Sequence, residues 1–214
     1  KLAPVGSKLE MRVKGPNVTP GYWQQPELTR QGFDEEGFFK MGDAGAFADP
    51  DDPVKGLVFE GRTAENFKLM SGTWVHAGEL RLAAVAAGAP VIQDAVVAGH
   101  DREMVGLLVF PNVPACRALA KDAPADLPVA ELIRRPEVRS SLERGLGAYN
   151  AGNPGSSRFI ARALIMAEPP SIDANEITDK GYINQRAVLD RRKALVERLF
   201  AAGDPDVIDF TART

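Results

Sequence analysis

Alternating and short apolar runs at the start of the chain predict β-strands with a small helix between them. Leu9, Met11 and Val13 alternate with polar residues, which is the period-two pattern of a strand with one buried face, here the face that carries these three residues. Residues 26–30 are long enough for only a short helix. Residues 57–59 form a further apolar run, which predicts another strand. The first part of the chain is therefore expected to be β-rich.

Prolines and glycines indicate where these strands end. Residues 15–17 supply a turn directly after the first strand. Residues 49–53 contain two prolines, each without a backbone N–H, so this stretch cannot continue a central strand and is expected to be an exposed turn. Glycines and aromatic residues are interspersed between residues 21 and 47, which is typical of small β structure with loops.

After Arg62 the pattern changes and predicts a sheet with helices. Residues 67–75 indicate a tight hairpin around Ser71 and Gly72, and the alanine-rich residues 79–87 indicate a helix that Gly88 ends. The next predicted elements, in chain order, are strands at 91–98 and 105–110, helices at 114–121 and 136–149, and a strand at 159–166.

The last predicted element is an amphipathic helix from about residue 185 to residue 201. Its apolar residues lie near one stripe, and they are Val188, Leu189, Leu195, Val196 and Leu199. Its basic residues lie mostly outside that stripe, and they are Arg186, Arg191, Arg192, Lys193 and Arg198. We interpret this basic surface as a solvated face.

Together these elements predict the α+β class. A β-rich segment at residues 1–63 is followed by a compact α+β unit at residues 64–214, which has a short central sheet flanked by helices. The second unit has about 150 residues, a normal size for a domain. The boundary is expected near residues 63–65.

Composition and charge narrow the class of protein. The chain has 214 residues, is 44% hydrophobic and carries a net charge of -3, which is ordinary for a soluble globular protein and does not indicate a nucleic-acid partner. No apolar run approaches the roughly 20 residues of a membrane helix. We expect no membrane association. The chain begins at Lys1 without an initiator Met, so we expect a piece of a longer protein.

Cysteine and histidine usage argues against disulfide and zinc chemistry. The single Cys116 excludes an internal disulfide framework, and with only two histidines no usual zinc spacing is present. We predict no metal site and a cytoplasmic location. His76 and His100 fit no catalytic triad with Cys116, so all three are interpreted as structural.

Three short motifs carry candidate chemistry. Asp43 follows a glycine in Phe39-Lys40-Met41-Gly42-Asp43, where a carboxylate can accept hydrogen bonds from the two hydroxyls of a ribose; the alternative is a turn aspartate that caps its own backbone. The planar, charged fork of Arg62 suits ribose and phosphate oxygens, whereas the alternative is a surface arginine at a domain junction.

The third motif contains Lys180, in the run Glu-Ile-Thr-Asp-Lys-Gly-Tyr-Ile-Asn-Gln at residues 176–185. Its ammonium on a long flexible stem suits a position beside developing negative charge. The alternative is a solvated loop lysine. Asp179 beside it is either a tether for the lysine or a turn residue.

The order and spacing of these motifs resemble the C-terminal half of the acyl-adenylate-forming enzymes. The matching set is Gly-Pro-Asn-Val-Thr-Pro-Gly-Tyr-Trp at residues 15–23, then Gly42-Asp43, Gly61-Arg62, Lys68, Gly72 and the late Lys180. That superfamily includes acyl-CoA synthetases, luciferases and nonribosomal peptide adenylation domains. Residues 176–186 are most similar to bacterial feruloyl-CoA synthetases. The resemblance spans nearly the whole chain, and its specificity lies in the ordered set rather than in any single motif.

The resemblance implies roles for these residues. Asp43 and Arg62 are implied to contact the nucleotide, and Lys180 is implied to be the catalytic lysine of adenylation. Ala64 stands at the implied hinge, where relatives usually have Asp or Lys, so any hydrogen bond of that side chain is absent here. Lys68 begins a stretch implied to border the pantetheine tunnel, in which Gly72 leaves room for a thin ligand.

The implied whole is an ATP-dependent acid–CoA ligase with a small C-terminal lid domain. Its cofactors and substrates are ATP/AMP, CoA and Mg²⁺, and its acid is aromatic or hydroxycinnamic. Residues 1–63 are then the distal β-rich part of the large adenylating domain, whose remainder is the missing N-terminal partner. No phosphate loop occurs here, so the chain is expected to be inactive alone, and a homodimer is possible.

Two other functions remain open at this point. The acceptor in the same chemistry can be a carrier-protein thiol instead of CoA. The chain can also be a non-catalytic module that binds a nucleotide or a partner domain.

Overall fold

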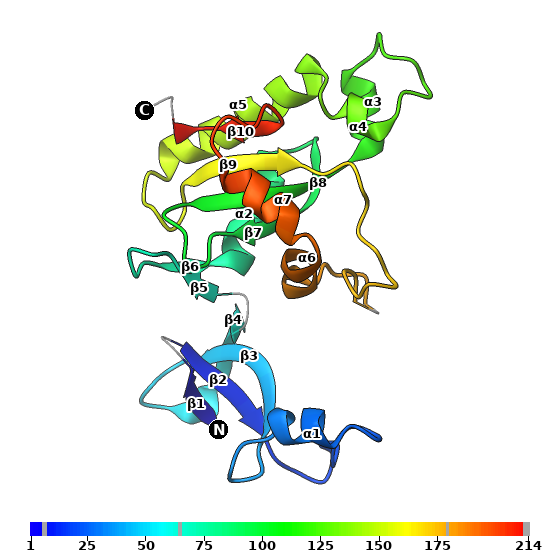
Figure 1. Cartoon of the computed structure of the whole chain (residues 1–214). Helices are drawn as coiled ribbons and strands as arrows, with labels where there is room; N and C mark the ends of the chain where they lie inside the picture. Colours follow the sequence, from blue (N-terminus) through cyan, green and yellow to red (C-terminus); the bar gives the residue numbers. More distant parts are fainter. Residues whose placement is uncertain (6–7, 64–65, 179, 212–214) are drawn as a thin grey trace. The chain divides into compact units, whose positions relative to one another are not determined.

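A computed structural model describes residues 1–5, 8–63, 66–178 and 180–211, with the backbone alone described at residues 60 and 61. The chain divides into two compact units, Lys1–Glu65 and Asn66–Thr214 (Figure 1). Both units mix strands and helices, so the α+β class is confirmed. No helix among the described residues is long and apolar enough to cross a membrane.

The first unit is built on a four-stranded antiparallel sheet. Its strands lie in the order of the chain: β1 (Leu2–Val5), β2 (Lys8–Val13), β3 (Phe39–Phe47) and β4 (Leu57–Arg62). The short helix α1 (Pro26–Gly32) and the 3-10 turn η1 (Pro53–Lys55) lie in its connections. The predicted strands, short helix and proline-containing turn are all present.

The buried face of β2 differs from the expectation. Leu9 and Val13 are 37% and 38% exposed, whereas Glu10 on the opposite face is only 6% exposed. Glu10 is tolerated there because its carboxylate accepts a hydrogen bond from Arg12 at 2.8 Å, and Arg12 in turn donates to Asp34 at 3.0 Å. Alternation identified the strand but gave the wrong inward face.

A second four-stranded sheet is the centre of the unit Asn66–Thr214. Its strands, in spatial order, are β10 (Val207–Asp209), β9 (Ile160–Ile165), β8 (Val105–Pro111) and β7 (Ile92–Ala98). Only β8 and β9 run parallel. A separate hairpin joins β5 (Asn66–Lys68) to β6 (Trp74–His76), as predicted.

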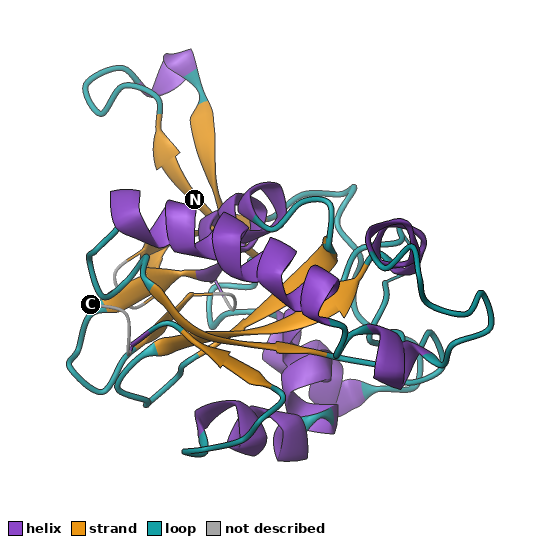
Figure 2. Ribbon diagram, turned by 90° about the horizontal axis from the view of Figure 1, so that it is seen from above, coloured by secondary structure: helices purple, strands orange, loops and turns teal. Residues whose placement is uncertain are grey.

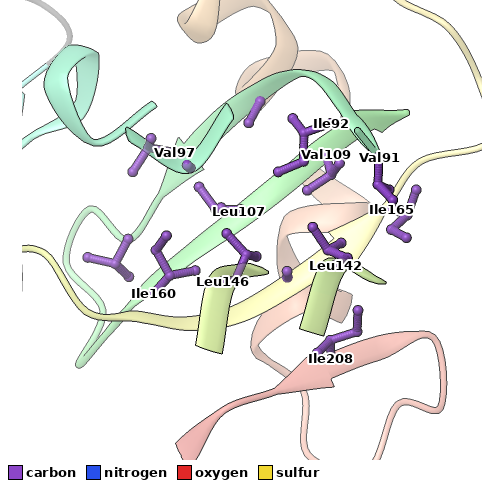
Figure 3. Packing of buried hydrophobic residues seen from close by; sticks show 14 of the residues in the cluster. Val91, Ile92, Val97, Leu107, Val109, Leu142, Leu146, Ile160, Ile165 and Ile208 are labelled. Carbon is purple, nitrogen blue, oxygen red and sulfur yellow. The ribbon is translucent and has the colours of Figure 1, made fainter. Parts of the chain in front are cut away.

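Helices cover both faces of this sheet (Figure 2). On one face, Val97, Leu107 and Val109 pack in a large apolar cluster with residues of α2 (Ala77–Ala87) and α5 (Pro136–Gly152), such as Leu146 (Figure 3). The smaller helices α3 (Val113–Leu119) and α4 (Val129–Leu132) also belong to this side. Neither α4 nor β10 is predicted by the pattern of residues.

The opposite face carries the last two helices of the chain. Leu108 and Phe110 of β8 pack there with Val188 and Leu199, which belong to α6 (Gln185–Arg191) and α7 (Lys193–Phe200). Successive residues of β7 and β8 thus enter different clusters. This explains their nearly continuous apolar sequence, because strands buried on both faces do not alternate.

Gly145 allows the two helices on the first face to approach closely. A Cβ at this position of α5 would collide with the carbonyl oxygen of Ala87 at the end of α2. Nearby Gly147, on the same helix, has open space around it. The backbone of α5 therefore touches the end of α2 directly at Gly145.

The predicted last helix is broken at Arg192. This residue has φ -98° and ψ 29° and separates α6 from α7. Its side chain is buried, which corrects the prediction that it belongs to a solvated basic face. The reason is a buried carboxylate, Glu176, that the guanidinium contacts with Nε at 2.8 Å.

Gln185 fixes the start of α6 against the sheet. Its side-chain Oε1 accepts a hydrogen bond from the N–H of Val97 at 3.0 Å, and its Nε2 donates to the carbonyl of Ala95 at 3.1 Å. Both partners lie on β7, the outer strand of the sheet. The side-chain amide therefore serves two backbone groups at a sheet edge.

Candidate functional site

Asp43 and Arg62 lie directly opposite each other on β3 and β4. Nε of Arg62 is 3.1 Å from Oδ1 of Asp43, and Nη1 also donates to the carbonyl of Met41 at 3.3 Å. The pairing register of the strands shifts between Asp43 and Gly45, so the sheet is irregular at this point. Strand pairing thus brings together two residues that are 19 positions apart in the sequence.

The environment of this pair leaves it accessible. The side chain of Asp43 is 21% exposed and that of Arg62 is 57% exposed. Asp43 lies within a strand rather than in a turn, which argues against the alternative of a turn aspartate. A carboxylate and a guanidinium side by side can accept from hydroxyl groups and donate to phosphate or ribose oxygens.

Lys68 and Gly72 belong to the β5–β6 hairpin. The Lys68 ammonium lies 5.0 Å from the centroid of the Trp74 ring, a cation–π distance. Gly72 has φ +83°, a left-handed conformation that favours glycine, and the space around it is open. The hairpin turn is closed by the N–H of Gly72, which donates to the carbonyl of Leu69 at 2.8 Å.

Lys180 lies in a turn whose two sides are hydrogen-bonded to each other. The N–H of Thr178 donates to the carbonyl of Tyr182 at 2.8 Å, and that of Gly181 donates to the carbonyl of Thr178 at 2.9 Å. Below them, Ile177 and Ile183 form an isolated antiparallel bridge. The side chain of Lys180 is exposed.

The sequence pattern did not predict the buried ion pair between Glu176, which precedes this turn, and Arg192. Glu176 is fully buried, and hydrogen bonding from Arg192 is the main reason that its pKa falls from 4.5 to about 2. It is therefore a carboxylate at neutral pH. A signal was present in the sequence, since a glutamate in a loop and an arginine in the next helix can pair. Charge periodicity nevertheless favoured a solvated arginine.

The candidate residues fall into the two units. Asp43 and Arg62 belong to Lys1–Glu65, while Lys68, Gly72 and Lys180 belong to Asn66–Thr214. Two further expectations lie outside the described residues. These are the hinge at Ala64 and the role of Asp179.

Cys116 is consistent with a structural role. It is fully buried in α3, and burial raises the pKa of its thiol to about 11. The thiolate, which is the nucleophilic form, is therefore disfavoured at neutral pH. Across the described ranges, no three His, Cys, Asp or Glu side chains are grouped in a way that could hold a metal ion.

Comparison with protein families gives one match that covers most of the chain. Residues 68–204 match the AMP-binding enzyme C-terminal domain. The probable acyl-activating enzyme 16, chloroplastic, of Arabidopsis thaliana is 31% identical over 207 residues, which cover 93% of this chain and 28% of that protein. The long-chain-fatty-acid acyl-carrier-protein ligase AEE15, chloroplastic, of the same plant is 35% identical over 206 residues, covering 94% and 26%.

Solved structures with the same fold include an adenylation domain. The A domain of carboxylic acid reductase from Segniliparus rugosus, in complex with AMP and a co-purified carboxylic acid, has a TM-score of 0.69 to this chain at 24% identity. The match covers 94% of this chain and 31% of that one. The chain thus spans about a quarter to a third of the length of each of these three proteins.

Proposed function

This chain belongs to the AMP-binding enzyme C-terminal domain family of the acyl-adenylate-forming superfamily, and we propose that it serves an ATP-dependent acid–thiol ligase. In the first half-reaction a carboxylate oxygen attacks the α-phosphorus of ATP, and the bond to pyrophosphate breaks to leave acyl-AMP. In the second, a thiol sulfur attacks the acyl carbon, AMP leaves and the thiol proton is released. The observation that carries the proposal is the exposed Lys180 turn within the matched domain.

Asp43 and Arg62 are proposed to bind the nucleotide. Their 3.1 Å ion pair holds a carboxylate and a guanidinium side by side on adjacent strands. The Asp43 carboxylate can accept from the ribose hydroxyls, while Arg62 offers N–H groups to ribose or phosphate oxygens. This supports recognition of ATP in the first half-reaction and of AMP in acyl-AMP.

Lys180 is proposed to stabilise the transition state of adenylation. Negative charge on the attacking carboxylate and the α-phosphate grows as the new bond forms, and a positioned ammonium lowers the energy of that state. A hinge at Ala64 would let the unit that carries Lys180 present the lysine for one half-reaction and withdraw it for the other. Lys68 and Gly72 would then face the thiol substrate during the second.

Mg²⁺ is expected to accompany ATP and to screen its phosphates. The described residues include no grouped set of metal ligands, so no step is assigned to a metal held by this chain.

CoA is the proposed thiol. The hairpin glycine Gly72, with open space beside it, supports a path for a thin thiol-bearing chain.

The alternative acceptor is a carrier-protein thiol, which the likeness to a long-chain-fatty-acid acyl-carrier-protein ligase supports. Other relatives include a probable CoA ligase of Humulus lupulus at 31% identity and a 2-succinylbenzoate–CoA ligase at 34% identity. Product analysis with CoA against an acyl carrier protein distinguishes the two acceptors. We propose an aromatic or hydroxycinnamic acid as the substrate, as the resemblance of residues 176–186 implies. The relatives named here are acyl-activating enzymes, CoA ligases and a carboxylic acid reductase, so they support the superfamily and not feruloyl-CoA synthetase specifically.

Replacement of Lys180 with alanine in the complete polypeptide tests the catalytic proposal. We expect pyrophosphate release to fall about a hundredfold to a thousandfold, the usual cost of losing one group that stabilises developing charge. Thioester formation from supplied acyl-AMP should stay close to the original rate, because that step does not need the lysine.

The matched control is Lys121→Ala, which removes an exposed lysine after α3 in the same unit and should leave both half-reactions unchanged. Equal loss of both half-reactions in Lys180→Ala would contradict the assigned role. We also propose that residues 1–214 alone do not form acyl-AMP; adenylation by this chain in isolation would contradict that part. Nucleotide binding without chemistry by the complete polypeptide would instead favour a non-catalytic module.

A further inference from the structure

Glu176 is the most deeply buried charged group in the described part of the second unit, and it lies four residues before Lys180. Arg192 contacts it with two parallel bonds, Nε to Oε1 at 2.8 Å and Nη2 to Oε2 at 2.9 Å. Arg191 adds a third bond to Oε2 at 2.9 Å. Such a bidentate pair fixes orientation as well as distance.

The same arginine also bonds to the loop that follows β9 and leads toward Lys180. Nη1 of Arg192 donates to the carbonyl of Glu168 at 2.9 Å, and Nη2 donates to that of Pro169 at 2.7 Å. Glu176 in turn accepts from the N–H of Ser171 at 2.8 Å. The loop between β9 and Glu176 is therefore wrapped around one guanidinium.

The turn beyond Glu176 is attached to this centre on its other side. The carbonyl of Glu176 accepts from the N–H of Asn184 at 2.9 Å, so the chain leaves and re-enters the turn at one point. Asn184 caps α6, with its side-chain oxygen accepting from the N–H of Ala187 at 3.3 Å. Next to it, Gln185 is bonded to β7. Both ends of the Lys180 turn are thereby connected to rigid elements.

We propose that Glu176 and Arg192 form a positioning pair that fixes the Lys180 turn for adenylation. This inference rests on the role proposed for Lys180. A misplacement of about 1 Å at a reacting centre can cost about a hundredfold in rate, and the lysine stem alone does not prevent it because it is long and flexible. Burying an ion pair is not needed for stability, since well-packed apolar residues commonly serve as well or better. The function that we assign to this pair is therefore to hold the turn that carries Lys180 in place.

The test uses the complete polypeptide and follows the two half-reactions separately. In Glu176→Gln, which removes the charge but keeps the shape, we expect the kcat of acyl-AMP formation to fall about a hundredfold with little change in the KM for ATP. Thioester formation from supplied acyl-AMP should be retained. Arg191→Gln, which removes only one of the bonds to Glu176, should give a smaller loss of the same kind.

A double-variant cycle separates positioning from general damage. If Glu176 acts through Lys180, then adding Glu176→Gln to Lys180→Ala should cause no further loss of adenylation. The proposal would be overturned if Glu176→Gln lowered adenylation by the same factor in the Lys180→Ala background as in the original protein. It would also be overturned if Glu176→Gln alone slowed both half-reactions equally. Arg191→Gln keeps the proposal testable if Glu176→Gln does not fold, because unchanged adenylation in that variant would also overturn it.

The matched control is Asp206→Asn. Asp206 also receives two arginines, Arg134 at 2.7 and 2.8 Å and Arg198 at 3.0 Å, but it lies just before β10. This variant should leave the ratio of the two half-reactions unchanged. If Lys180→Ala itself does not lower adenylation, the role proposed for Lys180 fails. If Lys180→Ala lowers adenylation but Glu176→Gln does not, only the positioning pair fails.

Discussion

At the scale of single residues, the ion pair between Asp43 and Arg62 offers a way to test nucleotide binding without unfolding the protein. Arg62 is more than half exposed, and exposed ion pairs usually contribute only about 0–1 kcal/mol to stability. Its loss should therefore leave the sheet intact. Any large effect on the use of ATP can then be assigned to the nucleotide contact.

Replacement of Asp43 with asparagine should raise the KM for ATP about tenfold to a hundredfold. A hydrogen bond to a charged group contributes about 1.5–3 kcal/mol, and the neutral amide accepts from the ribose less strongly. The original protein should also discriminate against 2′-deoxy-ATP, and Asp43→Asn should lose most of that discrimination. Steady-state kinetics with both nucleotides in the complete polypeptide measures this.

Asp49→Asn is the control for that experiment. Asp49 is also paired, with Oδ2 at 2.6 Å from the Lys55 ammonium, but it lies in the turn between β3 and β4. It should not change the KM for either nucleotide. Unaltered discrimination between ATP and 2′-deoxy-ATP in Asp43→Asn would rule out the ribose contact.

At the scale of elements, the packing of α5 against the end of α2 depends on the absence of a side chain at Gly145. Gly145→Ala should destabilise the protein by about 1–3 kcal/mol, because the added methyl group overlaps the backbone of α2. Gly147→Ala, on the same helix but in open space, should stabilise it by up to about 1 kcal/mol through helix propensity. Urea unfolding of both variants measures the difference, and a stabilising Gly145→Ala would contradict the contact.

Element prediction from sequence succeeded where the local pattern determines the outcome. The strands β7, β8 and β9 are strongly apolar, and α2 ends at Gly88 as expected. It failed at Arg192, whose side chain is buried against a partner 16 residues away in the chain. The short elements α4 and β10 also escaped prediction, because three or four residues carry too little periodicity.

For the candidate site, the sequence motifs indicated which residues to consider, but not how these residues are placed. Ordered motifs pointed to Asp43, Arg62 and Lys180, but only strand register places Asp43 opposite Arg62. The burial of Glu176 could not be read from the sequence, since loop glutamates are usually solvated. The inward face of β2 was wrong for a related reason: Glu10 is buried by pairing with Arg12.

At the scale of the whole molecule, acid should weaken the unit Asn66–Thr214 through two carboxylates that are paired with arginines, the buried Glu176 and the half-buried Asp206. Hydrogen bonds from Arg192 lower the pKa of Glu176 to about 2, and those from Arg134 lower the pKa of Asp206 to about 2. Unfolded carboxyl groups titrate near about 4. Because the folded values are depressed, the stabilisation is present above about pH 4 and is lost as the pH falls toward about 2.

Urea unfolding of the 214-residue chain at several pH values measures this effect. The original chain should be more stable than the double variant Glu176→Gln, Asp206→Asn at about pH 7, and the difference should shrink at about pH 3. A difference in stability that does not depend on pH would show that these carboxylates do not titrate with depressed values.

The contact of Gln185 with β7 also bears on how copies of this protein behave at high concentration. An outer strand presents unpaired N–H and C=O groups to which a strand of another molecule can add, which is a common route to aggregation. Gln185 already occupies the N–H of Val97 and the carbonyl of Ala95, in the middle of that strand. One glutamine side chain thus both attaches the start of α6 to the sheet and blocks intermolecular sheet growth at this edge.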